Sequence, residues 1–185
     1  MKGVFLGACM EYHKNYNLDY NDIEKTSEHI NIIGDMLKVN LNNYDFILAS
    51  PPCNYYSRAN YRREISNYAQ TTKHLLPELL KKCNETDKPF LIENVRNYKL
   101  YEKTGIIKYC IENNIFIYIV GRHTYFTKEL INLQSPQNKD NIQKKQHKSK
   151  NLNNYRQGGE NVHNTFEIFL KLMKEYEERG IFKNE

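Results

Sequence analysis

A cysteine stands directly behind two prolines at the end of an apolar run, in the stretch "ILASPPCNYYSRAN" (residues 47–60). A second apolar run, "PFLI", ends in "ENV" and so places Glu93 at a similar point further along the chain. A thiolate is a strong nucleophile near neutral pH when its pKa is lowered, and a carboxyl group beside it can act as a general acid. Cys53 and Glu93 therefore suit covalent catalysis, provided that the fold brings them together.

Short apolar runs alternate with amphipathic stretches along the chain. This alternation predicts a mostly parallel, Rossmann-like sheet covered on both faces, in a single α/β domain. Ligands bind such sheets at the carboxyl ends of the strands, where Cys53 and Glu93 are expected. We expect extended segments at 3–9, 30–33, 45–50, 89–95 and 115–121, and helices at 22–30 (capped by Asp22), 69–83 (with Pro77 either inside it or starting it), 104–114 and 164–180.

The bulk composition is that of a globular protein. Of the 185 residues, 39% are hydrophobic and 26% charged, and no apolar run approaches the roughly 20 residues needed to cross a bilayer. The start "MKGVFLGACMEYHK" lacks a cleavage site for a signal peptide. The four cysteines are widely spaced, which argues against a zinc site or a disulfide scaffold and predicts a reducing cytoplasm.

Charge and residue usage suggest a setting and a division of the chain. The net charge of +5 suits a nucleic-acid partner without requiring one. Abundant Asn, Lys, Ile and Tyr have A/T-rich codons, which is typical of a low-GC bacterium or its phage. We expect an α/β core over 1–133, a polar basic loop or disordered segment over 134–157 and a helix within 158–185 that packs back on the core.

"SPPC" followed by "YS", and "ENV" closing the next strand, together resemble the cytosine-5 DNA methyltransferase family. The matching residues are Pro52, Cys53, Glu93, Asn94 and Val95. The resemblance implies that Cys53 adds to carbon 6 of a flipped-out cytosine while Glu93 holds or protonates ring N3. It also implies S-adenosylmethionine as the methyl donor and no metal. The two prolines would keep the nucleophile loop extended and stiff.

Other interpretations of these residues stay open. Cys53 by itself has the profile of a small buried hydrophobic side chain, and Glu93 by itself that of a surface residue or a helix cap. The methyltransferases that modify exocyclic amino groups use Ser/Asp-Pro-Pro and a nearby aromatic residue without a thiol. This chain has "SPP" with Tyr55 and Tyr56 nearby, but those enzymes have no counterpart of "IENV".

The resemblance extends to the donor site. "NIIGDM" resembles the family segment whose acid bonds the adenine amine, which implies roles for Asp35 and Met36. Glu11 or Asp19 would hold the ribose. Only "FLGAC" (residues 5–9) stands for the family's glycine-rich loop, so that loop is degenerate or the chain starts at the family's second strand, with a partner chain or self-association completing the site. "GGENV" loosely resembles the last motif, through Asn161 and Val162.

Basic residues near the nucleophile are candidates for nucleic-acid contact. The stretch "SRANYRR" interleaves arginines with Tyr61, and "GRHTYF" adds His123, with the weaker signal, at the same predicted edge. No insertion large enough for the family's target-recognition domain is present. The candidates for contact with DNA are Ser57, Arg58, Arg62, Arg63 and Arg122.

The leading hypothesis is an S-adenosylmethionine-dependent cytosine-5 methyltransferase that acts on DNA. RNA is an alternative substrate, because one branch of the family resembles a DNA enzyme and modifies tRNA. A hypothesis of a different class is a catalytically incomplete relative that serves as a nucleic-acid-binding or accessory subunit.

Overall fold

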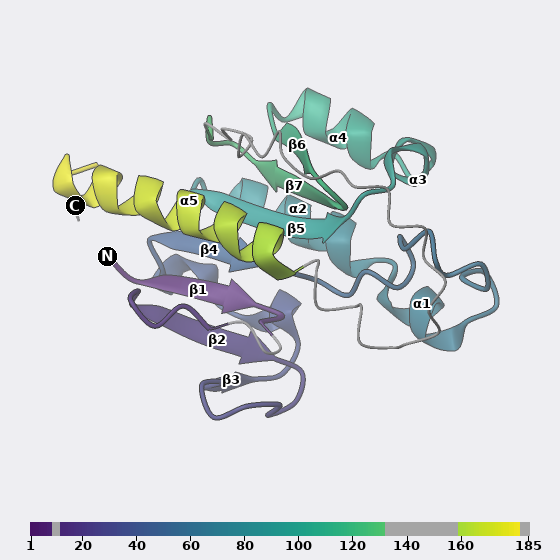
Figure 1. Cartoon of the computed structure of the whole chain (residues 1–185), viewed down its shortest axis with the longest axis horizontal. Helices are drawn as coiled ribbons and strands as arrows, with labels where there is room; N and C mark the ends of the chain where they lie inside the picture. Colours follow the sequence, from purple (N-terminus) through teal and green to yellow (C-terminus); the bar gives the residue numbers. More distant parts are fainter. Residues whose placement is uncertain (9–11, 132–158, 182–185) are drawn as a thin grey trace, which may run out of the picture.

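A computed structural model describes residues 1–8, 12–131 and 159–181, with the side chains of the last range described from residue 165 onward. Seven strands form one sheet in the order β3-β2-β1-β4-β5-β7-β6 (Figure 1). Strands β1 to β5 are parallel to one another, and β7 is antiparallel to both β5 and β6. The strands are β1 Gly3–Leu6, β2 Leu18–Asp22, β3 Ile32–Ile33, β4 Phe46–Ala49, β5 Phe90–Val95, β6 Phe116–Val120 and β7 His123–Thr127.

Helices cover both faces of the sheet, as the continuously apolar strands predict. The long helix α5 crosses one face, with α2 and α4 on the other (Figure 1). Phe5 and Leu48 pack with Phe166 and Phe169 of α5, whereas their neighbours in the strands face α2 and α4. The helices are η1 Met36–Lys38, η2 Leu41–Asn43, α1 Asn67–Thr72, α2 Leu75–Glu85, α3 Tyr98–Lys103, α4 Ile106–Glu112 and α5 Gly159–Glu178.

The first strand lies at the centre of the sheet. Strand β1 pairs with β2 on one side and with β4 on the other. The order 3-2-1-4-5 is that of a doubly wound fold whose first strand is present. The alternative that the chain starts at the family's second strand is therefore wrong, and "FLGAC" is the loop that follows the first strand.

Several expected elements differ from the structure. The helix predicted at 22–30 is absent: Asp22 ends β2, and its carboxylate accepts from Ile23 N at 2.7 Å and Thr26 Oγ1 at 3.1 Å. Such local side-chain bonds compete with helix formation. The helix predicted at 69–83 divides into α1 and α2, and Pro77 lies in the first turn of α2, where its missing N–H removes no helical bond.

The remaining helices lie closer to the ranges predicted from the sequence. The segment at 104–114 contains α4, while α3 and β7 are elements that the sequence did not predict. Helix α5 packs on the core as expected. Residues 134–157, expected to be a polar loop, lie outside the described residues. No helix in the described ranges is long and apolar enough to cross a membrane.

The glycine after β1 is required by the backbone. Gly7 has φ +65°, and a Cβ atom there would lie 2.8 Å from the carbonyl oxygen of Ser50. We expect Gly7→Ala to lower the free energy of unfolding by about 2 kcal/mol or more, because the left-handed conformation costs about 1–2 kcal/mol before any clash. Urea denaturation measures this. Gly105→Ala is the control, since Gly105 has φ +79° but open space around its Cβ position. Equal losses in the two variants would show that the close approach to Ser50 has no effect on stability.

Candidate active site

The Cys53 loop (residues 50–57) follows β4 and is held by two asparagines, one in β5 and one just after it. Asn94 Nδ2 donates to Pro51 O at 3.1 Å, and Asn97 Nδ2 donates to Tyr56 O at 2.7 Å. Both asparagines are buried. Buried carbonyl groups need such partners, so these bonds fix the loop on both sides of Cys53. Asn94 thus lies beneath the loop and contacts it through Pro51, directly before Pro52.

Glu93 lies in β5, near the carboxyl ends of the parallel strands, where the Cys53 loop also lies. Its Oε2 accepts from Ser50 Oγ at 2.7 Å, and its Oε1 lies 2.6 Å from His123 Nδ1. The residue is only 8% exposed. A buried carboxylate needs hydrogen-bond partners, and here both oxygens have one. From the sequence, His123 is only a weak candidate for a site residue. In the structure, the antiparallel pairing of β7 with β5 brings His123 beside Glu93.

Cys53 and Glu93 interact electrostatically. Burial raises the pKa of the Cys53 thiol, and the negative charge of Glu93 raises it further. A nucleophile of lowered pKa is expected from the sequence, whereas the surroundings of this thiol favour its protonated form.

The expected donor residues divide into two groups. Asp35 follows β3, and its Oδ1 accepts from Leu37 N at 2.9 Å; Met36 beside it is buried. The Cε atom of Met36 comes within 3.0 Å of the position that a Cβ on Gly7 would occupy. The structure thus brings the segment after β3 against the loop after β1.

Asp19 does not belong to this group. It pairs with Val4 near the amino end of β2, where it bonds Lys2 at 2.7 Å, Asn31 at 2.8 Å and Tyr44 at 2.9 Å. Burial alone would raise the pKa of Asp19, but these three bonds outweigh it and lower the pKa. Asp19 therefore belongs to a structural network at the amino ends of the strands, away from the Cys53 loop. This corrects the expectation that Asp19 contacts the donor.

The acid at the carboxyl end of β2 is Asp22, which is expected from the sequence to cap a helix. The strand was missed because "LDYND" has only two apolar residues, although Leu18 and Tyr20 alternate with polar ones as in a strand. Glu11, the other expected ribose acid, lies outside the described residues. Asn161 and Val162 fall in the first turn of α5, and their side chains lie outside the described residues.

The arginines differ in their availability to a nucleic acid. Arg58, Arg62 and Arg122 are exposed, and Arg122 lies in the turn between β6 and β7. Arg63 instead turns inward, where its Nη2 donates to Ser57 O at 2.7 Å. Ser57 is half-buried, and its Oγ accepts from Ala59 N at 3.3 Å. The three exposed arginines are the expected contacts most accessible to phosphate groups.

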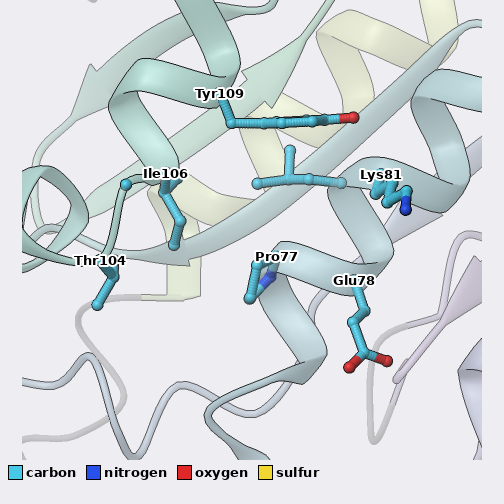
Figure 2. A pocket seen from close by; sticks show the side chains of 8 residues that line it. Pro77, Glu78, Lys81, Thr104, Ile106 and Tyr109 are labelled. Carbon is cyan, nitrogen blue, oxygen red and sulfur yellow. The ribbon is translucent and has the colours of Figure 1, made fainter.

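A hollow of about 300 Å³ lies on the face of the sheet away from α5 (Figure 2). Its lining is largely apolar, with Glu78 and Lys81 among the residues from α2 and Ile106 and Tyr109 from α4. It contains none of the expected site residues. In the described ranges, no cluster of His, Cys, Asp and Glu side chains could hold a metal ion.

The chain is similar to a known protein family over more than half of its length. The family model of the C-5 cytosine-specific DNA methylase matches residues 6–117, a span that contains Cys53, Glu93 and the acids after β2 and β3. No curated protein matches the chain. Because the matched span is more than half of the 185 residues, the chain belongs to the C-5 cytosine-specific DNA methylase family.

Proposed function

We propose that the protein transfers a methyl group from S-adenosylmethionine to carbon 5 of cytosine in DNA, through a covalent adduct with Cys53. The observation that supports this most is the convergence of Cys53 and Glu93 at one edge of the sheet, where the charge of Glu93 acts on the thiol. Membership of the family makes methyl transfer to cytosine the expected reaction.

The proton balance of the first step fits these two residues. As sulfur bonds to carbon 6, the thiol gives its proton to the Glu93 carboxylate, and ring N3 gains a proton from Glu93 as the π electrons of the ring shift toward N3. Glu93 thus carries a proton from the thiol to N3 and prevents negative charge from accumulating on the ring. After methylation, water accepts the carbon 5 proton, the C6–S bond cleaves to restore the aromatic ring, and the N3 proton returns through Glu93 to Cys53.

The residues after β1, β2 and β3 suit the proposed donor, which supplies an electrophilic methyl group. Asp22 and Asp35 offer carboxylate oxygens to hydroxyl and amino groups. Gly7 lets the loop after β1 pack closely against Ser50 and Met36, beside the segment that contains Asp35.

We expect Asp22→Asn to weaken binding of S-adenosylhomocysteine by about 10-fold to 100-fold, because hydrogen bonds to a charged group contribute about 1.5–3 kcal/mol. Calorimetric titration measures this. Asp19→Asn is the matched control and should leave the affinity unchanged, since Asp19 lies at the opposite edge. An unchanged affinity in Asp22→Asn would contradict the assignment of Asp22.

The function itself is tested by incubating the protein with DNA and isotopically labelled donor, followed by analysis of the nucleosides. We expect 5-methylcytosine. Label on the exocyclic amino group would support the amino-methyltransferase alternative, and transfer only to tRNA would support the RNA alternative.

A second candidate function is that of an accessory subunit that binds nucleic acid without catalysis. The single glycine in "FLGAC" favours it, because the family's loop normally has more. Absence of S-adenosylhomocysteine binding at millimolar ligand, both alone and with DNA, would support this candidate over an autonomous enzyme.

A further inference from the structure

Three polar side chains meet on neighbouring strands at the edge of the sheet: Ser50 after β4, Glu93 in β5 and His123 at the start of β7. Ala49 pairs with Ile92, so Ser50 and Glu93 are the next residues along the two strands. His123 pairs with Val95, two residues beyond Glu93. Side chains two residues apart on a strand share a face. We call these three residues the Glu93 network.

The two partners of Glu93 differ in what they can do. His123 Nδ1 lies 2.6 Å from Oε1. When Glu93 is ionised, this oxygen can only accept, so the hydrogen bond then requires the proton on Nδ1. In the neutral ring this makes Nε2 the unprotonated nitrogen. The Ser50 hydroxyl donates to Oε2 at 2.7 Å, but it can rotate and accept instead. His123 is therefore a fixed donor, whereas Ser50 is an adaptable partner.

This asymmetry decides which oxygen of Glu93 can carry an acidic proton. A proton on Oε1 would point at the N–H of His123, so two donors would face each other. A proton on Oε2 meets only a hydroxyl that can turn away or accept. Protonated Glu93 therefore carries its proton on Oε2.

We propose that His123 is a positioning residue that fixes the orientation of the Glu93 carboxyl group and directs its acidic proton to Oε2, the oxygen that protonates N3 of the target base. This inference rests on the proposed function. In the step, the Oε2–H bond breaks as the N3–H bond forms, and Oε1 keeps its hydrogen bond from His123 throughout. The same proton returns to Oε2 when the ring is released.

The test is a matched pair of substitutions at His123. Asparagine places its amide nitrogen close to where Nδ1 stood, and glutamine places it close to where Nε2 stood. We expect the single-turnover rate of adduct formation on 5-fluorocytosine DNA, with donor present, to fall about 10-fold to 100-fold in His123→Gln. His123→Asn should stay within about threefold of the wild type. The KM for DNA should stay unchanged in both.

A double-mutant cycle shows whether His123 acts through Glu93. In the Glu93→Gln background, His123→Gln should cost less than about twofold. His74→Gln is the control for loss of a histidine, because His74 is exposed at the start of α2. Thermal denaturation checks that each variant is folded.

The outcomes separate the two proposals. Absence of an adduct with the wild-type protein would contradict the proposed function, and this inference with it. If the wild type forms the adduct, equal rates in wild type and His123→Gln would overturn the role of His123 alone. An equally slow His123→Asn variant, or a full cost of His123→Gln in the Glu93→Gln background, would also overturn it.

Discussion

Replacement of Cys53 by serine is expected to abolish covalent capture of DNA that contains 5-fluorocytosine. A serine hydroxyl stays protonated at neutral pH and is a far weaker nucleophile than a thiolate. Fluorine at carbon 5 cannot leave as a proton does, so the normal release step stalls and the wild-type protein remains attached to the oligonucleotide. Denaturing gel electrophoresis with donor present measures the adduct.

Two controls make this result specific to Cys53. Binding of S-adenosylhomocysteine should be retained in Cys53→Ser, since the expected donor residues follow β1, β2 and β3 rather than β4. Cys110→Ala should still form the adduct, because burial raises the pKa of Cys110 to about 12 and the residue lies inside α4. An adduct that survives in Cys53→Ser would assign the nucleophile to a different cysteine.

Glu93→Gln is expected to change two rates in opposite directions. Methyl transfer should fall by about 10²-fold to 10⁴-fold, the usual contribution of a general acid. Alkylation of Cys53 by iodoacetamide should become faster, because the negative charge of Glu93 now raises the pKa of the thiol. Without that charge the pKa falls, and at a given pH below it more of the thiol is ionised.

The pH dependence of alkylation, followed by mass spectrometry of the peptide that contains Cys53, measures the second effect. The midpoint should lie at lower pH in Glu93→Gln than in the wild type. Glu102→Gln is the control, since Glu102 is exposed on α3 and should alter neither rate. A variant in which methylation and alkylation both slow would indicate a disturbed loop rather than a lost acid.

The Cys53→Ser and Glu93→Gln experiments test different chemical properties of two neighbouring residues. Cys53→Ser removes the atom that bonds to the base, whereas Glu93→Gln keeps the shape of the side chain and removes its charge and its acidity. Asn94 and Asn97 hold the loop from residues that neither substitution changes. A loss of activity in both variants, with faster alkylation in the second, would assign the nucleophile and the acid separately.

The sequence by itself determined the class of fold and the central pair of residues. Phe46–Ala49 and Phe90–Val95 are strands in the structure because their apolar runs are buried on both faces, a property that local composition records. The residues that follow such strands must lie at one edge, so the sequence alone is enough to pair Cys53 with Glu93. A candidate site that is defined by residue types at the ends of strands can therefore be predicted from short stretches of sequence.

Which strand is central, and which acid therefore lies at the carboxyl ends of the parallel strands, depends on the tertiary structure. Strand order depends on hydrogen bonds between distant segments, which the sequence does not show. By sequence, Gly3–Leu6 fits either the first or the second strand of the family. Its pairing with both β2 and β4 identifies it as the first. That pairing places Asp22 at the carboxyl edge and Asp19 at the other. The contact between His123 and Glu93 could not be predicted from the sequence for the same reason. His123 reaches Glu93 only because β7 pairs antiparallel with β5 in this register.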